Sequence, residues 1–85
     1  MKLIISHEQG TLDLTYSPLV EVFVDMIWVE PDHRRRGIAR HLMWEALALT
    51  RGLGLSIRLE APTELEAFYQ SLGFVKDQGG LWCAN

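Results

Sequence analysis

The stretch Val29-Glu30-Pro31-Asp32-His33-Arg34-Arg35-Arg36-Gly37-Ile38-Ala39 decides the fold, because it joins the end of a strand to the start of a helix. Before it, residues 20–29 are nearly all apolar, which predicts a central strand covered on both faces. After it, apolar residues recur at helical spacing over residues 38–53, and Gly54 is placed to end the helix. These patterns predict a strand that leads directly into an amphipathic helix.

Shorter elements flank this unit on both sides. Residues 2–6 and 11–16 predict an antiparallel hairpin around a loop at residues 7–10, and residues 55–60 alternate as a strand that follows the helix. Thr63 and Glu66 have the spacing of a capping box, which predicts a second helix from Thr63 to Leu72. Residues 74–76 and 81–83 predict a closing hairpin. The expected order is β-β-β-α-β-α-β-β, an α/β (α+β) fold in a single domain over residues 1–85.

Composition narrows the class of protein. The chain has 85 residues and a net charge of −3, from 8 basic and 11 acidic side chains, which argues against a nucleic-acid coating protein. Cys83 is the single cysteine and the three histidines lack a metal spacing, so neither a disulfide nor a metal site is expected. We expect Cys83 to be a small apolar residue of an edge strand, and His7, His33 and His41 to be surface residues. No apolar run has the length of a membrane span or a signal peptide. These features predict a cytoplasmic protein without a membrane partner.

The turn before the predicted long helix has the properties of an anion site. The first amides of a helix lack internal partners and lie at the positive end of its dipole, so a diphosphate can be held from about Arg35 to Arg40. Gly37 lets phosphate oxygens approach the chain, Ala39 keeps the wall thin, and the three preceding arginines add forked donors. A solvated charge run is the competing interpretation. The chain lacks both Gly-Lys-Ser/Thr and Gly-x-Gly-x-x-Gly, so neither nucleotide hydrolysis nor dinucleotide binding is expected.

Arg34, Gly37 and Ala39 also fit the pattern Arg/Gln-x-x-Gly-x-Gly/Ala, which resembles the acetyl-coenzyme A signature of the GNAT (Gcn5-related) N-acetyltransferases. The segments Val29-Glu30-Pro31 and Phe68-Tyr69-Gln70-Ser71-Leu72-Gly73-Phe74 are similar to further motifs of that family. The resemblance covers about three quarters of the chain, from Val20 onward. It implies a trimmed GNAT fold without the usual N-terminal strand and two helices. The sheet would be mixed and mostly antiparallel, with splayed central parallel strands.

This resemblance also implies a site. Acetyl-coenzyme A, the co-substrate, would lie between the splayed strands and pair with the backbone near Val29. The residues expected to bind it are Ile27, Trp28, Val29, Arg34, Arg35, Arg36, Gly37, Ile38, Ala39, Arg40, Phe68 and Tyr69.

Tyr69 matches the tyrosine that protonates the departing thiolate in many members of the family, although the bare pattern also fits a core tyrosine of an amphipathic helix. The position of the glutamate base found in some members is Phe23, so no family base carries over. Asp25 and Glu60 are candidate catalytic bases. A solvated carboxylate on a strand is the competing interpretation for each, and a chain of water could carry the proton instead.

By the same resemblance, the protein is an N-acetyltransferase that moves acetyl to a primary amine by direct attack. The acceptor can be a protein lysine, an N-terminus or a small amine. The missing helices usually form one wall of the acceptor site, so the site would be open, completed by a second subunit, or matched to a large acceptor. Short phage-encoded members that modify a lysine of a bacterial defence nuclease look similarly trimmed. Trp44 is placed to face another subunit in a homodimer. The alternative function is a non-catalytic acyl-coenzyme A-binding sensor or interaction module.

Overall fold

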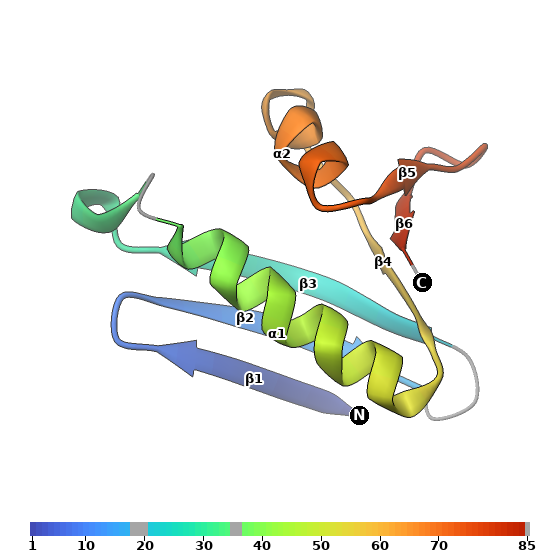
Figure 1. Ribbon diagram of the computed structural model, residues 1–85, viewed down its shortest axis with the longest axis horizontal. Helices are drawn as coiled ribbons and strands as arrows, with labels where there is room; N and C mark the ends of the chain where they lie inside the picture. Colours follow the sequence, from blue (N-terminus) through green and yellow to red (C-terminus); the bar gives the residue numbers. More distant parts are fainter. Residues whose placement is uncertain (18–20, 35–36, 85) are drawn as a thin grey trace.

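The computed structural model describes residues 1–17, 21–34 and 37–84, and this part of the chain forms a six-stranded sheet with two α-helices (Figure 1). The sheet order is β1-β2-β3-β4-β6-β5, in which only β3 and β4 are parallel neighbours. The elements in chain order are β1 (Lys2–His7), β2 (Gly10–Tyr16), β3 (Glu21–Val29), α1 (Ile38–Leu53), β4 (Ser56–Leu59), α2 (Glu66–Ser71), β5 (Val75–Lys76) and β6 (Trp82–Ala84). Two 3₁₀ turns, Pro31–His33 and Thr63–Leu65, precede the helices. The predicted order of elements is confirmed.

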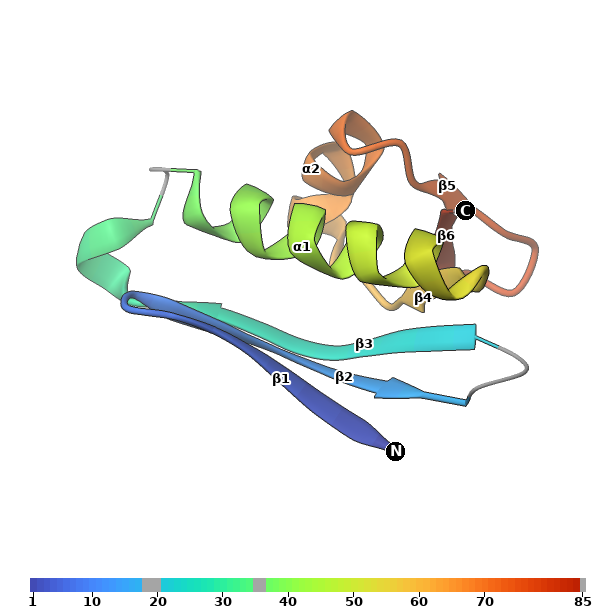
Figure 2. The ribbon, with the colours of Figure 1, turned by 60° about the horizontal axis from the view of Figure 1, so that its bottom comes forward.

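The core lies between α1 and one face of the sheet (Figure 2). Most of the apolar side chains at helical spacing are buried, namely Ile38, Leu42, Met43, Ala46 and Leu47, whereas Leu53 in the last turn is 50% exposed. The helix also buries Thr50, whose hydroxyl donates a hydrogen bond of 2.7 Å to the Ala46 carbonyl. The sheet side chains that meet the helix are Leu12, Leu14, Val22, Val24, Ile57 and Leu59. Alternation along β2, the first half of β3 and β4 places these residues on the same face, which explains the register of the sheet.

The expectation that the long central strand is covered on both faces is wrong. The side chains of Met26 and Trp28 are 57% and 45% exposed. They are paired with Asp13 and Thr11 of β2, which alternate with the buried Leu12, so they point away from α1. The apolar run cannot reveal this, because Met and Trp are equally compatible with a buried face and an exposed one. Val20, the expected first residue of this strand, lies outside the described residues.

One extra residue in β3 separates the two central strands. Along the β2 pairing, Leu14 lies opposite Val24 and Asp13 lies opposite Met26, so Asp25 has no partner and forms a β-bulge. The parallel pairing of β3 with β4 ends at Val24, the residue before the bulge. Beyond it the two strands diverge, as Figure 1 shows, and β4 runs toward α2. The predicted splay of the central strands therefore begins at Asp25.

Several local predictions differ from the structure. The capping box at Thr63 is wrong: Pro62 precedes the 3₁₀ turn, α2 begins at Glu66, and neither start has a side-chain cap. The Glu66 carboxylate instead lies 3.2 Å from the Lys76 ammonium, so this pair ties α2 to β5. The predicted edge position of Cys83 is also wrong, because β6 lies between β4 and β5. The first hairpin has a tighter turn than expected, since His7 pairs directly with Gly10.

Gly10 is required by a close approach of two backbones. A Cβ built there would lie 2.6 Å from the carbonyl oxygen of Trp28 and 3.3 Å from Val29. We predict that Gly10→Ala lowers the free energy of unfolding by about 2 kcal/mol, because the strands must move apart. Gly52→Ala is the control, since nothing in the described structure lies within 4 Å of that Cβ and alanine favours the helix. Equal urea midpoints for Gly10→Ala and the parent protein would contradict the prediction.

Candidate active site

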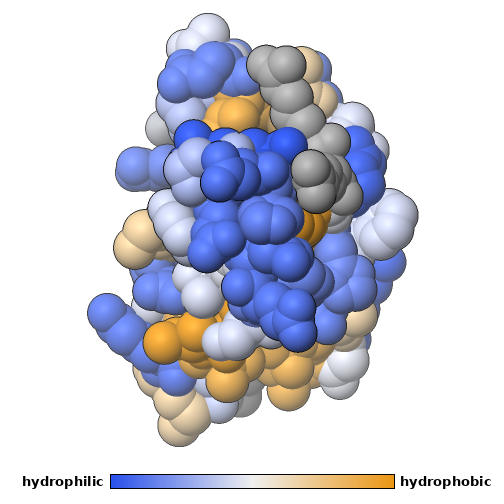
Figure 3. Space-filling model, turned by 90° about the vertical axis from the view of Figure 1, so that its left-hand side faces the viewer, coloured by the Kyte–Doolittle hydropathy of each residue, from blue (hydrophilic) through white to orange (hydrophobic). Residues whose placement is uncertain are grey.

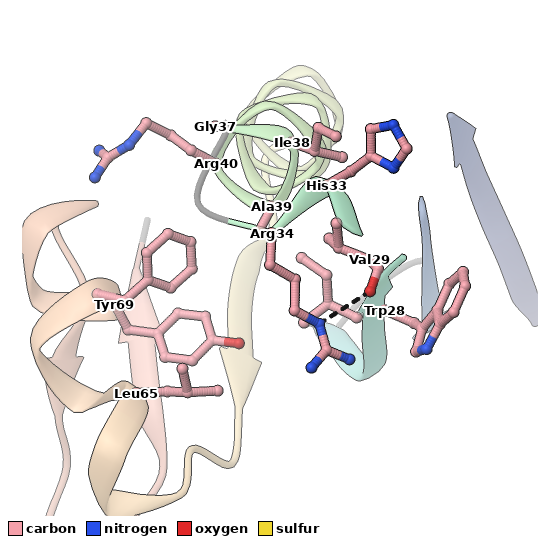
Figure 4. A pocket seen from close by; sticks show the side chains of 12 residues that line it. Trp28, Val29, His33, Arg34, Gly37, Ile38, Ala39, Arg40, Leu65 and Tyr69 are labelled. Atoms are coloured by element: carbon pink, nitrogen blue, oxygen red, sulfur yellow. Dashed lines mark hydrogen bonds between the residues drawn. The ribbon is translucent and has the colours of Figure 1, made fainter. Parts of the chain in front are cut away.

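A cavity of about 650 Å³ opens where β3 and β4 diverge (Figure 4). Its walls come from the end of β3, the following turn, the start of α1, and α2 with the turn before it. The residues that line it are Ile27, Trp28, Val29, His33, Arg34, Gly37, Ile38, Ala39, Arg40, Leu65, Phe68 and Tyr69. All of the residues that the sequence assigns to coenzyme binding are in this set, apart from Arg35 and Arg36, which lie outside the described residues. The structure thus brings these residues together, and their contacts with a ligand stay a prediction.

The backbone of β3 forms one wall of the cavity. After Val24, β3 pairs with β2 on one side and has no strand partner on the other side within the described structure. N–H and C=O groups on a free strand edge favour an extended ligand that carries amides. The wall can therefore hold an amide-bearing arm as if it were an additional strand.

The N-terminus of α1 forms the second wall. Gly37 precedes the helix with φ 80°, a left-handed conformation that favours glycine, and a Cβ there would meet nothing within 4 Å. The conformation of the backbone therefore favours glycine here, and the approach of phosphate oxygens to Gly37 stays a prediction. The helix start has no side-chain cap and no acidic residue in its first turn. Its first amides are consequently available to an anion.

Two arginines lie at different places around the cavity. The Arg34 side chain points into the cavity, and its Nε donates a hydrogen bond of 3.1 Å to the Val29 carbonyl (Figure 4). Arg40 lies on the α1 side, where its Nη2 donates to the Ser71 hydroxyl of α2 at 3.1 Å. Arg34 is thus bound to the strand backbone, while Arg40 bridges the two helices at the cavity wall.

Tyr69 combines a buried ring with a hydroxyl that points into the cavity (Figure 4). The residue is only 4% exposed, and its ring makes edge contacts with Phe68 and Phe74 at centroid distances of 5.1 and 5.7 Å. Burial raises the pKa of the Tyr69 hydroxyl, so the group stays a neutral phenol. No described residue hydrogen-bonds to this hydroxyl. Tyr69 is therefore a core residue whose neutral hydroxyl faces the cavity.

The two carboxylates expected as candidate bases lie elsewhere. Asp25 is exposed, and its Oδ2 accepts a hydrogen bond of 2.6 Å from the Thr15 hydroxyl. Glu60 is exposed directly after β4. Neither residue lines the cavity.

Two lining residues were missed by the sequence analysis. His33 was expected on the surface, but it is partly buried in the cavity wall, with its Nδ1 3.3 Å from a Glu30 carboxylate oxygen. Its place in the turn directly before Arg34 is the signal that could have found it. Leu65 lies four residues before Tyr69, a spacing that puts both on one side of a helical segment.

Cys83 has a structural environment away from the cavity. Its Sγ lies 3.6 Å from the Asp77 carboxylate, and burial, followed by this hydrogen bond, raises the pKa of the thiol. The Asp77 carboxylate also accepts from the Gly79 and Leu81 amides, so it organises the turn between β5 and β6. Within the described ranges, no cluster of three or more His, Cys, Asp or Glu could hold a metal ion. None of the described helices is long and apolar enough to cross a membrane.

The split parallel strand pair and the uncapped start of α1 together give the cavity a free strand edge and an anion-binding end. The family model for the acetyltransferase (GNAT) domain matches residues 3–76, and the chain belongs to this family. The resemblance found in the sequence is thereby confirmed. No curated protein matches the sequence.

Several solved structures are similar to this chain. The anti-CRISPR protein AcrVA5 superposes with a TM-score of 0.87 at 26% identity, over 99% of this chain and 98% of that one. Ard1 from Thermoplasma volcanium has a TM-score of 0.70 at 26% identity, over 88% of this chain and 60% of that one. PaiA N-acetyltransferase from Thermoplasma acidophilum, in complex with coenzyme A, has a TM-score of 0.67 at 18% identity, over 88% of this chain and 50% of its own. The chain thus spans most of AcrVA5 but only part of the other two.

The raised pKa of Tyr69 predicts a pH dependence of stability. The unfolded phenol ionises near pH ~10, below the folded pKa, so the stabilisation by the neutral form is complete below about pH 10 and lost as pH rises through the folded pKa. We expect the free energy of unfolding of the parent protein to fall more steeply above about pH 10 than that of Tyr69→Phe. Urea unfolding of both proteins along an alkaline series measures this difference. Parallel curves would contradict the prediction.

Proposed function

We propose that this protein is an N-acetyltransferase that moves acetyl from acetyl-coenzyme A to a primary amine, with a protein lysine as the acceptor. The observation that carries this proposal is the convergence of a free strand edge, an uncapped helix start and the Tyr69 hydroxyl on one cavity. The coenzyme supplies the acetyl group as a thioester. The membership in the acetyltransferase (GNAT) family supports the reaction, and the neighbour solved with coenzyme A supports the co-substrate.

The residues of the chain divide the binding between two walls. The first amides of α1, from Ile38 onward, receive the diphosphate, and Arg40 adds positive charge beside them. The backbone of Ile27 to Val29 pairs with the amide-bearing arm. The thioester is thereby directed toward the part of the cavity that the Tyr69 hydroxyl faces.

The transfer itself needs three events at the protein. The amine nitrogen attacks the thioester carbonyl and forms the C–N bond, while strand amides near Val29 stabilise the negative charge on the carbonyl oxygen. As the C–S bond breaks, the Tyr69 hydroxyl gives its proton to the departing thiolate, and the nitrogen loses its proton to water. The products are an amide and a free thiol, and Tyr69 regains its proton from solvent.

Exposed apolar side chains on the sheet face that points away from α1 support a large acceptor. Figure 3 views the end of the molecule that carries the turn into α1. Polar side chains lie in the middle of this view, and apolar side chains lie along its lower edge, on the side of β1. Ile4 of β1 is 61% exposed, and Met26 of β3 is 57% exposed. The similarity to an anti-CRISPR protein over nearly the whole of both chains also favours a macromolecular acceptor, because such a protein acts against a CRISPR system. A protein surface can cover these side chains, whereas a small amine cannot.

Replacement of Tyr69 tests the proposed reaction. We expect Tyr69→Phe to lower kcat at least tenfold, because a proton donor contributes roughly 10²–10⁴-fold where it operates. The affinity for acetyl-coenzyme A, measured by calorimetry, should stay within about twofold, since the ring and its packing remain. Thiol release with a panel of lysine peptides and small amines measures turnover. Unchanged kcat would remove Tyr69 from the mechanism, and the absence of acetylated product from every acceptor would contradict the proposed enzyme.

A second pair of variants tests the fate of the amine proton. Because neither Asp25 nor Glu60 lines the cavity, we expect Asp25→Asn and Glu60→Gln to keep kcat/KM within about twofold, with the same pH profile as the parent protein. A tenfold loss with a displaced pH profile in either variant would assign that carboxylate as the base. That carboxylate, and not water, would then accept the proton from the amine nitrogen.

A further inference from the structure

Trp44 is an exposed aromatic side chain on α1, one helical turn beyond a residue of the cavity. It is 56% exposed, although it lies in the middle of a helix whose other large apolar side chains are mostly buried. The Arg40 guanidinium lies over its ring at 6.0 Å from the centroid. Arg40 lines the cavity, whereas Trp44 does not. The tryptophan therefore stands just outside the cavity and is in contact with its wall.

Arg40 is held in place between two aromatic rings. Its guanidinium lies 5.8 Å from the centroid of the Phe68 ring of α2, and its Nη2 donates to the Ser71 hydroxyl, which in turn donates to the Phe68 carbonyl at 2.6 Å. Phe68 lines the cavity as well. A row of Phe68, Arg40 and Trp44 therefore leads from the cavity onto the surface of α1.

The row of Phe68, Arg40 and Trp44 lies on the side of the cavity where the nucleoside of coenzyme A is expected to emerge. The proposed function places the diphosphate at the start of α1 and the thioester arm against β3, so the nucleoside must leave the cavity near the first turns of the helix. Trp44 is four residues beyond Arg40, which is a rise of about 6 Å on the same face of the helix. A purine attached to the diphosphate can reach that distance.

We propose that Trp44 is the platform on which the adenine ring of coenzyme A stacks, with Arg40 facing the phosphates of the nucleotide. This inference rests on the proposed use of acetyl-coenzyme A and adds a specificity-determining subsite to it. An exposed indole can stack a purine on its open face, and Arg40 on the other face holds the ring in a fixed orientation. The site would thus recognise the nucleotide end as well as the thioester end.

The test compares two acyl donors by calorimetry: acetyl-coenzyme A and acetyl-phosphopantetheine, which has the same thioester arm and a phosphate but no adenosine. We expect Trp44→Ala to weaken the binding of acetyl-coenzyme A by roughly 5- to 100-fold, the range for loss of one stacked base. The binding of acetyl-phosphopantetheine should change less than about twofold. Trp44→Phe keeps a stacking ring and should restore most of the affinity. Leu53→Ala, at a half-exposed position in the last turn of α1, is the matched control.

Each other outcome has a defined meaning. Equal affinity of Trp44→Ala and the parent protein for acetyl-coenzyme A would overturn the platform and leave the proposed function intact. An equal loss for both donors would also overturn it, because Trp44 would then act through the shape of the cavity. If Trp44→Ala keeps its affinity but converts a dimer into a monomer in sedimentation, the ring belongs to a contact between two copies of the chain. If the parent protein binds neither donor, the proposed function itself fails.

Discussion

At Asp25 the strand β3 contains one residue more than its partner β2, and the pairing with β4 ends just before that residue. Most of the candidate site depends on this bulge. If the parallel pairing continued to Val29, β4 would occupy the strand edge that now borders the cavity, and α2 would lie elsewhere. The bulge increases the local twist of β3 and separates the two strands without breaking the β2 pairing on the other side.

The walls of the cavity are fixed by elements that are stable for other reasons. The start of α1 is tied to the core through Ile38 and Leu42, which pack against the sheet. The end of β3 is supported from behind by β2, where Gly10 lies so close to Trp28 that no side chain fits between the strands. Tyr69 is fixed by its two aromatic neighbours. Because each group is positioned by packing, its geometry is set before a ligand arrives.

The sequence predicted the features that depend on local chemistry. Gly37 before a helical pattern and Tyr69 within a spaced motif both identified residues that the structure places at the cavity. The sequence could not predict the bulge, because an aspartate in an apolar strand is compatible both with a continuous β2–β3 register and with a shifted one. The exposure of Met26 and Trp28 was not predicted for a related reason. The apolar pattern of a strand does not indicate whether a second layer covers its other face. The capping box failed because Pro62 starts the turn one residue earlier than the motif requires.

The hydrogen bond from Arg34 to the Val29 carbonyl has a consequence for how the cavity is filled. The Arg34 side chain occupies the position of a hydrogen-bond donor to the Val29 carbonyl, a backbone acceptor that would otherwise need water. A ligand amide that pairs with this carbonyl has to share it or take over the position of Arg34. Binding there is therefore an exchange of partners, and its net gain is the difference between two hydrogen bonds rather than the full strength of one.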